Sequence, residues 1–154
     1  MGPIIEILNK AKLRAKDEGL PYEGAFLPKE ALLFLQEDSS ARLVDVRTQA
    51  EWSWVGRIPG AVEIEWQVFP SMQANPNFLE HLSLKVPKES AVLFICRSGV
   101  RSNKAAIAAF ESGYLNCFNV LEGFEGDKDS DGHRGLKGGW KAADQSILLR
   151  HSMF

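Results

Sequence analysis

The chain has 154 residues, 45% of them apolar and 25% charged, as expected for one globular domain. Its formal net charge is −2, with 18 basic and 20 acidic side chains, whereas general nucleic-acid binders carry a large basic excess. Two cysteines are too few for a disulfide scaffold, and the apolar stretch at residues 4–8 is too short and polar for a signal peptide or membrane helix. We therefore expect a cytoplasmic protein with reduced thiols.

The N-terminal part of the chain predicts two helices and a buried strand. Apolar residues recur at helical spacing over residues 3–18, and Gly19 is a typical stop. Residues 20–27 contain Pro and Gly and predict a loop, after which a second helix is expected at about residues 28–37. The short apolar run at residues 43–46 contains β-branched side chains and predicts a strand.

Strands and helices alternate through the rest of the chain. Further strands are predicted at residues 61–66, 91–95 and 117–121. Further helices are predicted from Asn75 to about Leu84, at residues 102–112 and in the tail from Lys141, with a glycine-rich loop at residues 123–139. Because strands separated by helices need crossover connections, this order favours an α/β fold with a largely parallel sheet.

Cys96 lies at the position where ligands bind in such a fold. It follows the strand at residues 91–95, and a parallel strand delivers the next residue to the sheet edge where ligands bind. The next helix directs its N-terminus at the cysteine, and its free N–H groups and dipole favour an anion there. Gly99 lets the loop curl, while Arg97 and Arg101 add positive charge. These features favour the thiolate, which is the nucleophilic form.

Several interpretations compete for this loop. A lone cysteine is usually an inert buried side chain, but the strand, loop and helix around Cys96 favour a reactive one. Tyrosine phosphatases carry His-Cys, five residues and then Arg, whereas here Ile95 precedes the cysteine and Arg101 comes one position early. The shorter loop suits a terminal sulfur better than a phosphate. A cysteine phosphatase or arsenate reductase is the alternative enzyme, and a non-catalytic binding module is the third hypothesis.

Two signatures resemble the rhodanese family in its single-domain form, over about residues 28–140. The active-site loop of that family is very similar to residues 96–102, and its amino-terminal signature is similar to residues 43–47, Glu51 and residues 56–61. The chain resembles one bacterial subgroup in particular, at residues 120–126, 132–135 and 139–141. Many members have His where this chain has Arg57, and the chain departs from the subgroup after Ala143.

The resemblance implies a rhodanese-like three-layer α/β fold, with a largely parallel five-stranded sheet flanked by helices. The domain would span residues 28–141, preceded by a helix and loop at residues 1–27 and followed by a tail at residues 142–154. It implies a sulfurtransferase in which Cys96 takes sulfur from a small anionic donor such as thiosulfate, forming a persulfide. The acceptor would be cyanide in the assay, a thiol or a protein. The resemblance implies no cofactor, no metal, and no binding to nucleic acid or membrane.

Roles are also expected for residues around Cys96, for the loop from the resemblance and for the others from their residue types and positions. The expected anion-binding loop consists of Arg97, Ser98, Gly99, Val100, Arg101 and Ser102. The expected supporting charges, which fix the geometry through charge-assisted hydrogen bonds, are Asp45, Arg47, Glu51 and Arg57. Phe124 is expected at the mouth of the site.

Two further groups have competing interpretations. Cys117 is expected to be buried filler rather than a resolving thiol for Cys96. Asp127, Asp129 and Asp131 repeat the first half of an EF-hand loop, but position twelve is Gly138 instead of Glu, so we expect a solvated loop without calcium. The histidines show no metal-ligand spacing with either cysteine.

Overall fold

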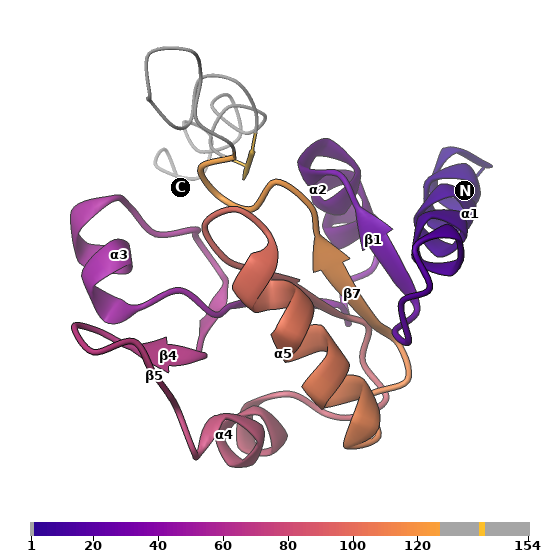
Figure 1. The fold of residues 1–154 in the computed structure, drawn as a ribbon. Coiled ribbons are helices and arrows are strands. Elements are labelled where there is room, and N and C mark those ends of the chain that lie inside the picture. The colour runs from indigo at the N-terminus through magenta and orange to yellow at the C-terminus, as the bar shows by residue number, and fades with distance from the viewer. Residues whose placement is uncertain (1, 127–138, 141–154) are drawn as a thin grey trace.

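A parallel sheet of five strands in the order β1-β7-β6-β2-β3 forms the centre of the molecule (Figure 1). The computed structural model describes residues 2–126 and 139–140. The strands of the sheet are β1 (Gly24–Phe26), β2 (Arg42–Asp45), β3 (Val62–Glu63), β6 (Val92–Ile95) and β7 (Cys117–Val120). The helices are α1 (Gly2–Asp17), α2 (Pro28–Glu37), α3 (Gln49–Trp54), α4 (Phe78–Lys85) and α5 (Val100–Glu111). The predicted α/β fold with a parallel sheet is therefore confirmed.

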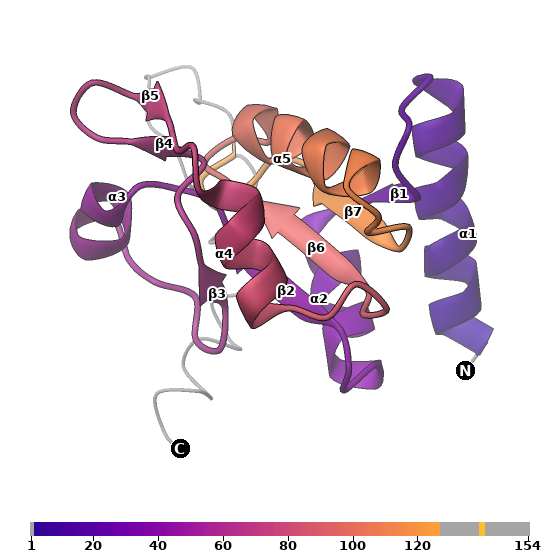
Figure 2. The ribbon, with the colours of Figure 1, turned by 90° about the horizontal axis from the view of Figure 1, so that it is seen from below.

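The two faces of the sheet are covered by different helices, as parallel sheets require. β6 is buried on both sides: Leu93 and Ile95 face a core that includes α2, while Val92 and Phe94 face a core that includes α4 and α5. Figure 2 shows α4 and α5 on one side of β6, α2 on the other, and α1 beside the β1 edge. This double burial explains why the strand sequence is a continuous apolar run instead of an alternating one.

An antiparallel hairpin lies outside the main sheet. It consists of β4 (Gln67–Val68) and β5 (Gln73–Ala74) and was not predicted, because neither strand has enough residues to show a period. Both figures place the hairpin beside α3 (Figures 1 and 2). Both elements belong to the long connections that follow β2 and β3, so they stand near the edge where Cys96 leaves β6.

Most predicted elements are confirmed, and the differences have local causes. Residues 20–27 contain β1 as well as a loop, because Gly24 allows the strand to approach Ala11 and the Phe118 ring, where a Cβ would lie 3.0 Å from both. The fourth helix begins at Phe78, since the Asn75 side chain accepts a hydrogen bond from the Asn77 N–H in the turn before it. The bounds predicted for α2 are confirmed.

The predicted helix at residues 102–112 begins two residues earlier, at Val100. Gly99 ends the preceding loop with a left-handed φ of 105°, and its carbonyl accepts the first helical hydrogen bond, from Asn103. Within the described residues, no helix is long and apolar enough to cross a membrane. The aspartate cluster at residues 127–131 and the tail at residues 142–154 lie outside the described residues.

Candidate active site

The Cys96 sulfur is buried at the carboxyl end of β6, where two groups contact it. The residue is only 1% exposed. The Gly99 N–H donates a hydrogen bond to Sγ at 3.1 Å, and the Ser102 hydroxyl oxygen lies 3.3 Å from Sγ. A hydrogen bond from a backbone N–H favours negative charge on sulfur, as the sequence predicts for this loop.

A buried asparagine on β7, which the sequence does not single out, contacts the same two residues, Ser102 and Gly99. The Ser102 hydroxyl donates to Asn119 Oδ1 at 2.6 Å, and Asn119 Nδ2 donates to the Gly99 carbonyl at 3.3 Å. Asn119 lies 23 positions after Cys96 and carries no motif of its own, so only the pairing of β7 with β6 brings the two together.

Arg101 forms a bidentate ion pair with Glu51 of α3. Its two terminal nitrogens donate to the two carboxylate oxygens at 2.7 and 2.9 Å. Burial alone would raise the pKa of the Glu51 carboxyl, but the hydrogen bonds and charge of Arg101, together with Thr48, lower it from 4.5 to about 2. Glu51 also completes the capping box of α3 with Thr48. Arg101 therefore fixes α3 against the Cys96 loop.

Asp45 and Arg47 form a second ion pair, completely buried below the loop. The Arg47 guanidinium donates to both Asp45 oxygens, the shortest bond being 2.7 Å, and also to the Gly56 carbonyl at 2.8 Å. The ring of Phe124 covers the guanidinium, with 4.2 Å between Cζ and the ring centroid. Phe124 is buried and does not line the cleft, in contrast to the expectation that it lies at the mouth. Arg57 pairs with Glu63 at the surface.

The turn after β7 supports the start of the Cys96 loop from below. The Phe124 N–H donates to the Cys96 carbonyl at 2.7 Å, and the Glu125 N–H donates to the Arg97 carbonyl at 3.0 Å. Gly123 has a left-handed φ of 63°, and a Cβ there would lie 2.5 Å from the Cys96 carbonyl oxygen. Only glycine permits this approach of two backbones.

A cleft of about 660 Å³ opens above Cys96, between the loop, α3 and the β4–β5 hairpin. Its mouth is apolar: Trp54 of α3 is 88% exposed and Phe69 of the hairpin is 58% exposed, and Met72 and Val100 are also exposed. Arg97 is exposed and lines the same cleft, as does the half-buried Ser98. Clusters of exposed apolar side chains on a soluble domain mark binding surfaces.

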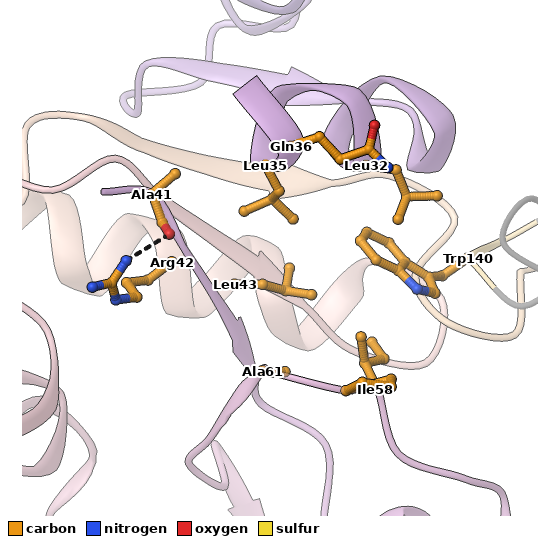
Figure 3. A pocket seen from close by; sticks show the side chains of 11 residues that line it. Leu32, Leu35, Gln36, Ala41, Arg42, Leu43, Ile58, Ala61 and Trp140 are labelled. Atoms are coloured by element: carbon orange, nitrogen blue, oxygen red, sulfur yellow. Dashed lines mark hydrogen bonds between the residues drawn. The ribbon is translucent and has the colours of Figure 1, made fainter. Parts of the chain in front are cut away.

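Another cavity, of about 460 Å³, lies on the α2 side of the sheet (Figure 3). Its walls are largely aliphatic, and Trp140 lines one end of it, between Leu32 and Ile58. Arg42, the one charged side chain among the described residues that line it, donates to the Ala41 carbonyl. Neither cysteine lines this cavity, so the chemistry that the sequence predicts belongs to the cleft above Cys96.

Cys117 lies far from Cys96 along the sheet. It pairs in register with Val92 at the start of β6, whereas Cys96 follows the end of that strand, about 13 Å further along at 3.3 Å per residue. Burial raises the pKa of the Cys117 thiol to about 12. Cys117 is therefore filler, as expected. Within the described ranges, no group of three or more His, Cys, Asp or Glu side chains could hold a metal ion.

The comparisons with known proteins agree with this geometry. The model of the rhodanese-like domain matches residues 28–130. This chain belongs to the rhodanese-like domain family. Two bacterial proteins are similar to it: the uncharacterized protein RP600 of Rickettsia prowazekii, 44% identical over 62% of this chain and 78% of its own, and a protein named sulfurtransferase of Allochromatium vinosum, 30% identical over 58% and 73%. The crystal structure of Rv0390 from M. tuberculosis matches with a TM-score of 0.68 and 42% identity, over 79% of this chain and 93% of that chain.

The Glu51–Arg101 pair predicts a pH-dependent stability. The Glu51 pKa is lower in the folded state than in the unfolded chain, so its contribution is complete above about pH 4.5 and is lost as the pH falls towards 2. At pH 7, Glu51→Gln should reduce the free energy of unfolding by an amount on the order of 3 kcal/mol, the equivalent of that pKa difference. In urea unfolding at pH 7, 5, 4 and 3, the difference in free energy of unfolding between Glu51→Gln and the wild type should decrease below pH 4.5.

The control for this measurement is Glu63→Gln, which breaks an ion pair of the same chemistry at the exposed Arg57. Its effect should stay within about 1 kcal/mol at every pH, because exposed pairs contribute little. If Glu51→Gln differs from the wild type by the same free energy of unfolding at pH 7 and pH 3, the stabilising role of the Glu51–Arg101 pair is contradicted.

The approach of Gly123 to the Cys96 loop predicts a steric effect that can be separated from backbone strain. Gly123→Ala and Gly60→Ala both place a Cβ at a left-handed φ, but Gly60 has no atom within 4 Å. Gly60→Ala should lower the free energy of unfolding by about 1 kcal/mol, whereas Gly123→Ala should cost several times more, since the Cys96 and Arg97 backbone must move. Equal losses in urea unfolding would show that the two backbones do not depend on this contact.

Proposed function

We propose that this rhodanese-like protein is a sulfurtransferase that carries sulfur on Cys96. The Cys96 thiolate attacks the outer sulfur of a donor such as thiosulfate, the sulfur–sulfur bond of the donor breaks, and sulfite leaves with the electron pair. Cys96 then holds a persulfide. An acceptor nucleophile attacks the terminal sulfur, a new bond to the acceptor forms, and Cys96 leaves as the thiolate. With cyanide as acceptor, the product is thiocyanate.

The observation that carries this proposal is the short anion-binding loop around the Cys96 sulfur. Gly99 donates its N–H to Sγ, and α5 begins at Val100, directly after it. The first N–H groups of a helix have no acceptor within the helix, so those of Val100, Arg101 and Ser102 are available for the charge of a persulfide or a bound donor. Arg97 is the exposed cation of the cleft and is suited to attract an anionic donor.

The position of Arg101 supports sulfur transfer over phosphoryl transfer. A cysteine phosphatase needs an arginine that folds over a tetrahedral phosphate above the cysteine. Here Arg101 comes one position early and both of its terminal nitrogens are hydrogen-bonded to Glu51. The name of the Allochromatium vinosum relative supports the same choice.

The cleft supports an acceptor larger than cyanide. A volume of about 660 Å³ with an apolar mouth exceeds the needs of a two-atom anion, and it suits an organic thiol or a protein cysteine instead. Thiols of this kind are reduced in the cytoplasm, which we propose as the location of the protein.

The persulfide predicts a change in intact mass. After incubation with thiosulfate, the wild type should gain one sulfur atom, and cyanide should remove it. Cys96→Ser should gain nothing, while Cys117→Ser should behave as the wild type because the Cys117 thiol is buried far from the cleft.

A wild-type protein that gains no sulfur, although Cys96 reacts with an alkylating reagent, would contradict thiosulfate as donor. Hydrolysis of a phosphate ester that depends on Cys96 would instead support the phosphatase.

A further inference from the structure

We propose that Asn119 is a positioning residue that controls the hydrogen bond between the Ser102 hydroxyl and the Cys96 sulfur. The role deepens the proposed function, on which it rests, because it concerns the sulfur that would carry the persulfide. Two groups contact Sγ in the described residues, the Gly99 N–H and the Ser102 hydroxyl. The two ends of the Asn119 amide bind to these same two residues.

Asn119 is well placed to fix both groups because its own backbone is fixed. It is the third residue of β7, is 3% exposed, and pairs in register with Phe94 of β6. Strands of a sheet hold side chains more firmly than loops do, so Asn119 connects the Cys96 loop to the sheet. The amide also faces the Tyr22 hydroxyl, whose own hydrogen bond goes to Asn103.

The Asn119 amide fixes the direction in which the Ser102 hydroxyl donates its hydrogen. Nδ2 can only donate and donates to the Gly99 carbonyl, so Oδ1, which can only accept, faces Ser102. The Ser102 hydroxyl has one hydrogen and gives it to Asn119. It therefore presents a lone pair to Cys96, which fits a protonated thiol as donor.

When Cys96 becomes a thiolate or a persulfide anion, the thiol hydrogen is gone and two acceptors face each other. The hydroxyl can then rotate its hydrogen from Asn119 to sulfur, without any movement of the backbone. That rotation breaks the hydrogen bond between Ser102 and Asn119 and leaves Oδ1 without its donor, so Asn119 opposes it. The sulfur anion thus has one donor in place, the Gly99 N–H, and gains the Ser102 hydroxyl only at the cost of the bond to Asn119.

The test measures how fast Cys96 reacts with iodoacetamide between pH 5 and 10, with intact mass as the readout. Asn119→Leu replaces the amide by an apolar group of similar volume, which frees the Ser102 hydroxyl to donate to the thiolate, and it should speed alkylation at pH 7 several-fold. The midpoint of its pH profile should move to lower pH. The charged and titratable groups around the sulfur, which are Asp45, Glu51, Arg97, Arg101 and Tyr22, are unchanged in this variant.

A double-mutant cycle separates positioning from a general loss of structure. Ser102→Ala should slow alkylation about tenfold, and Asn119→Leu should have no further effect in the Ser102→Ala background, because it acts through that hydroxyl. Tyr114→Phe is the matched control: it removes a buried hydroxyl that donates to the Val86 carbonyl, and its pH profile should match the wild type.

Asn119→Asp keeps the inference testable if the leucine variant does not fold. Its carboxylate still accepts from Ser102 but cannot donate to Gly99, and it adds negative charge near the sulfur. The pH midpoint should therefore move upwards, opposite to the leucine variant. An unchanged profile in a folded Asn119 variant, or an equal effect of Asn119→Leu with and without the Ser102 hydroxyl, would overturn the positioning role.

Alkylation does not require a sulfur donor, so these outcomes stand apart from the proposed function. If the wild type fails to accept sulfur from thiosulfate while the Asn119 variants still shift the profile, the sulfurtransferase proposal fails and the positioning role remains. If sulfur transfer to cyanide proceeds equally in wild type and Asn119→Leu, with equal profiles, only the positioning role fails.

Discussion

The site depends on the order of the three central strands, β7, β6 and β2, which all end at the same edge of the sheet. β6 delivers Cys96, and each neighbour contributes contacts to the loop that follows. β7 supplies Asn119, and the turn after β7 donates hydrogen bonds to the carbonyls of Cys96 and Arg97. From the segment after β2 comes Glu51, which binds Arg101. Parallel pairing thus brings together residues separated by more than 70 positions, and no local interaction could replace it.

The sequence predicts the parts of this site that are local, because their signals are contiguous. A run of apolar residues, a cysteine, a glycine-containing loop and an alanine-rich stretch predict the strand, the loop and the helix in their correct order. The α2 bounds are predicted for the same reason, with Pro28 at the first turn. The start of α5 was placed at Ser102 instead of Val100 because the helix begins on a left-handed Gly99, and the sequence does not show that conformation.

The remaining features arise from packing, which leaves no pattern in one sequence. Asn119 is an ordinary polar residue within a strand until β7 is placed beside β6. Phe124 resembles a residue at a mouth because glycines surround it, yet it covers the buried Arg47 guanidinium. Arg97 and Arg101 look equivalent in the loop, but Glu51 pairs with only one of them. Each distinction depends on a partner remote in the chain, so it requires the three-dimensional structure.

The division between strands and connections also separates two tasks of the site. The groups around the Cys96 sulfur come from β6, β7 and the first turn of α5. These elements are held by the buried core on both faces of the sheet. The walls of the cleft come from α3 and the hairpin, which stand outside that core and carry the exposed Trp54 and Phe69. Changes in these walls alter what reaches Cys96 without moving the donors around its sulfur. The Glu51–Arg101 pair is the link between the two parts, since one partner lies on the wall and the other on the helix that begins beside the sulfur. The pair therefore fixes the position of the α3 wall relative to the Cys96 sulfur.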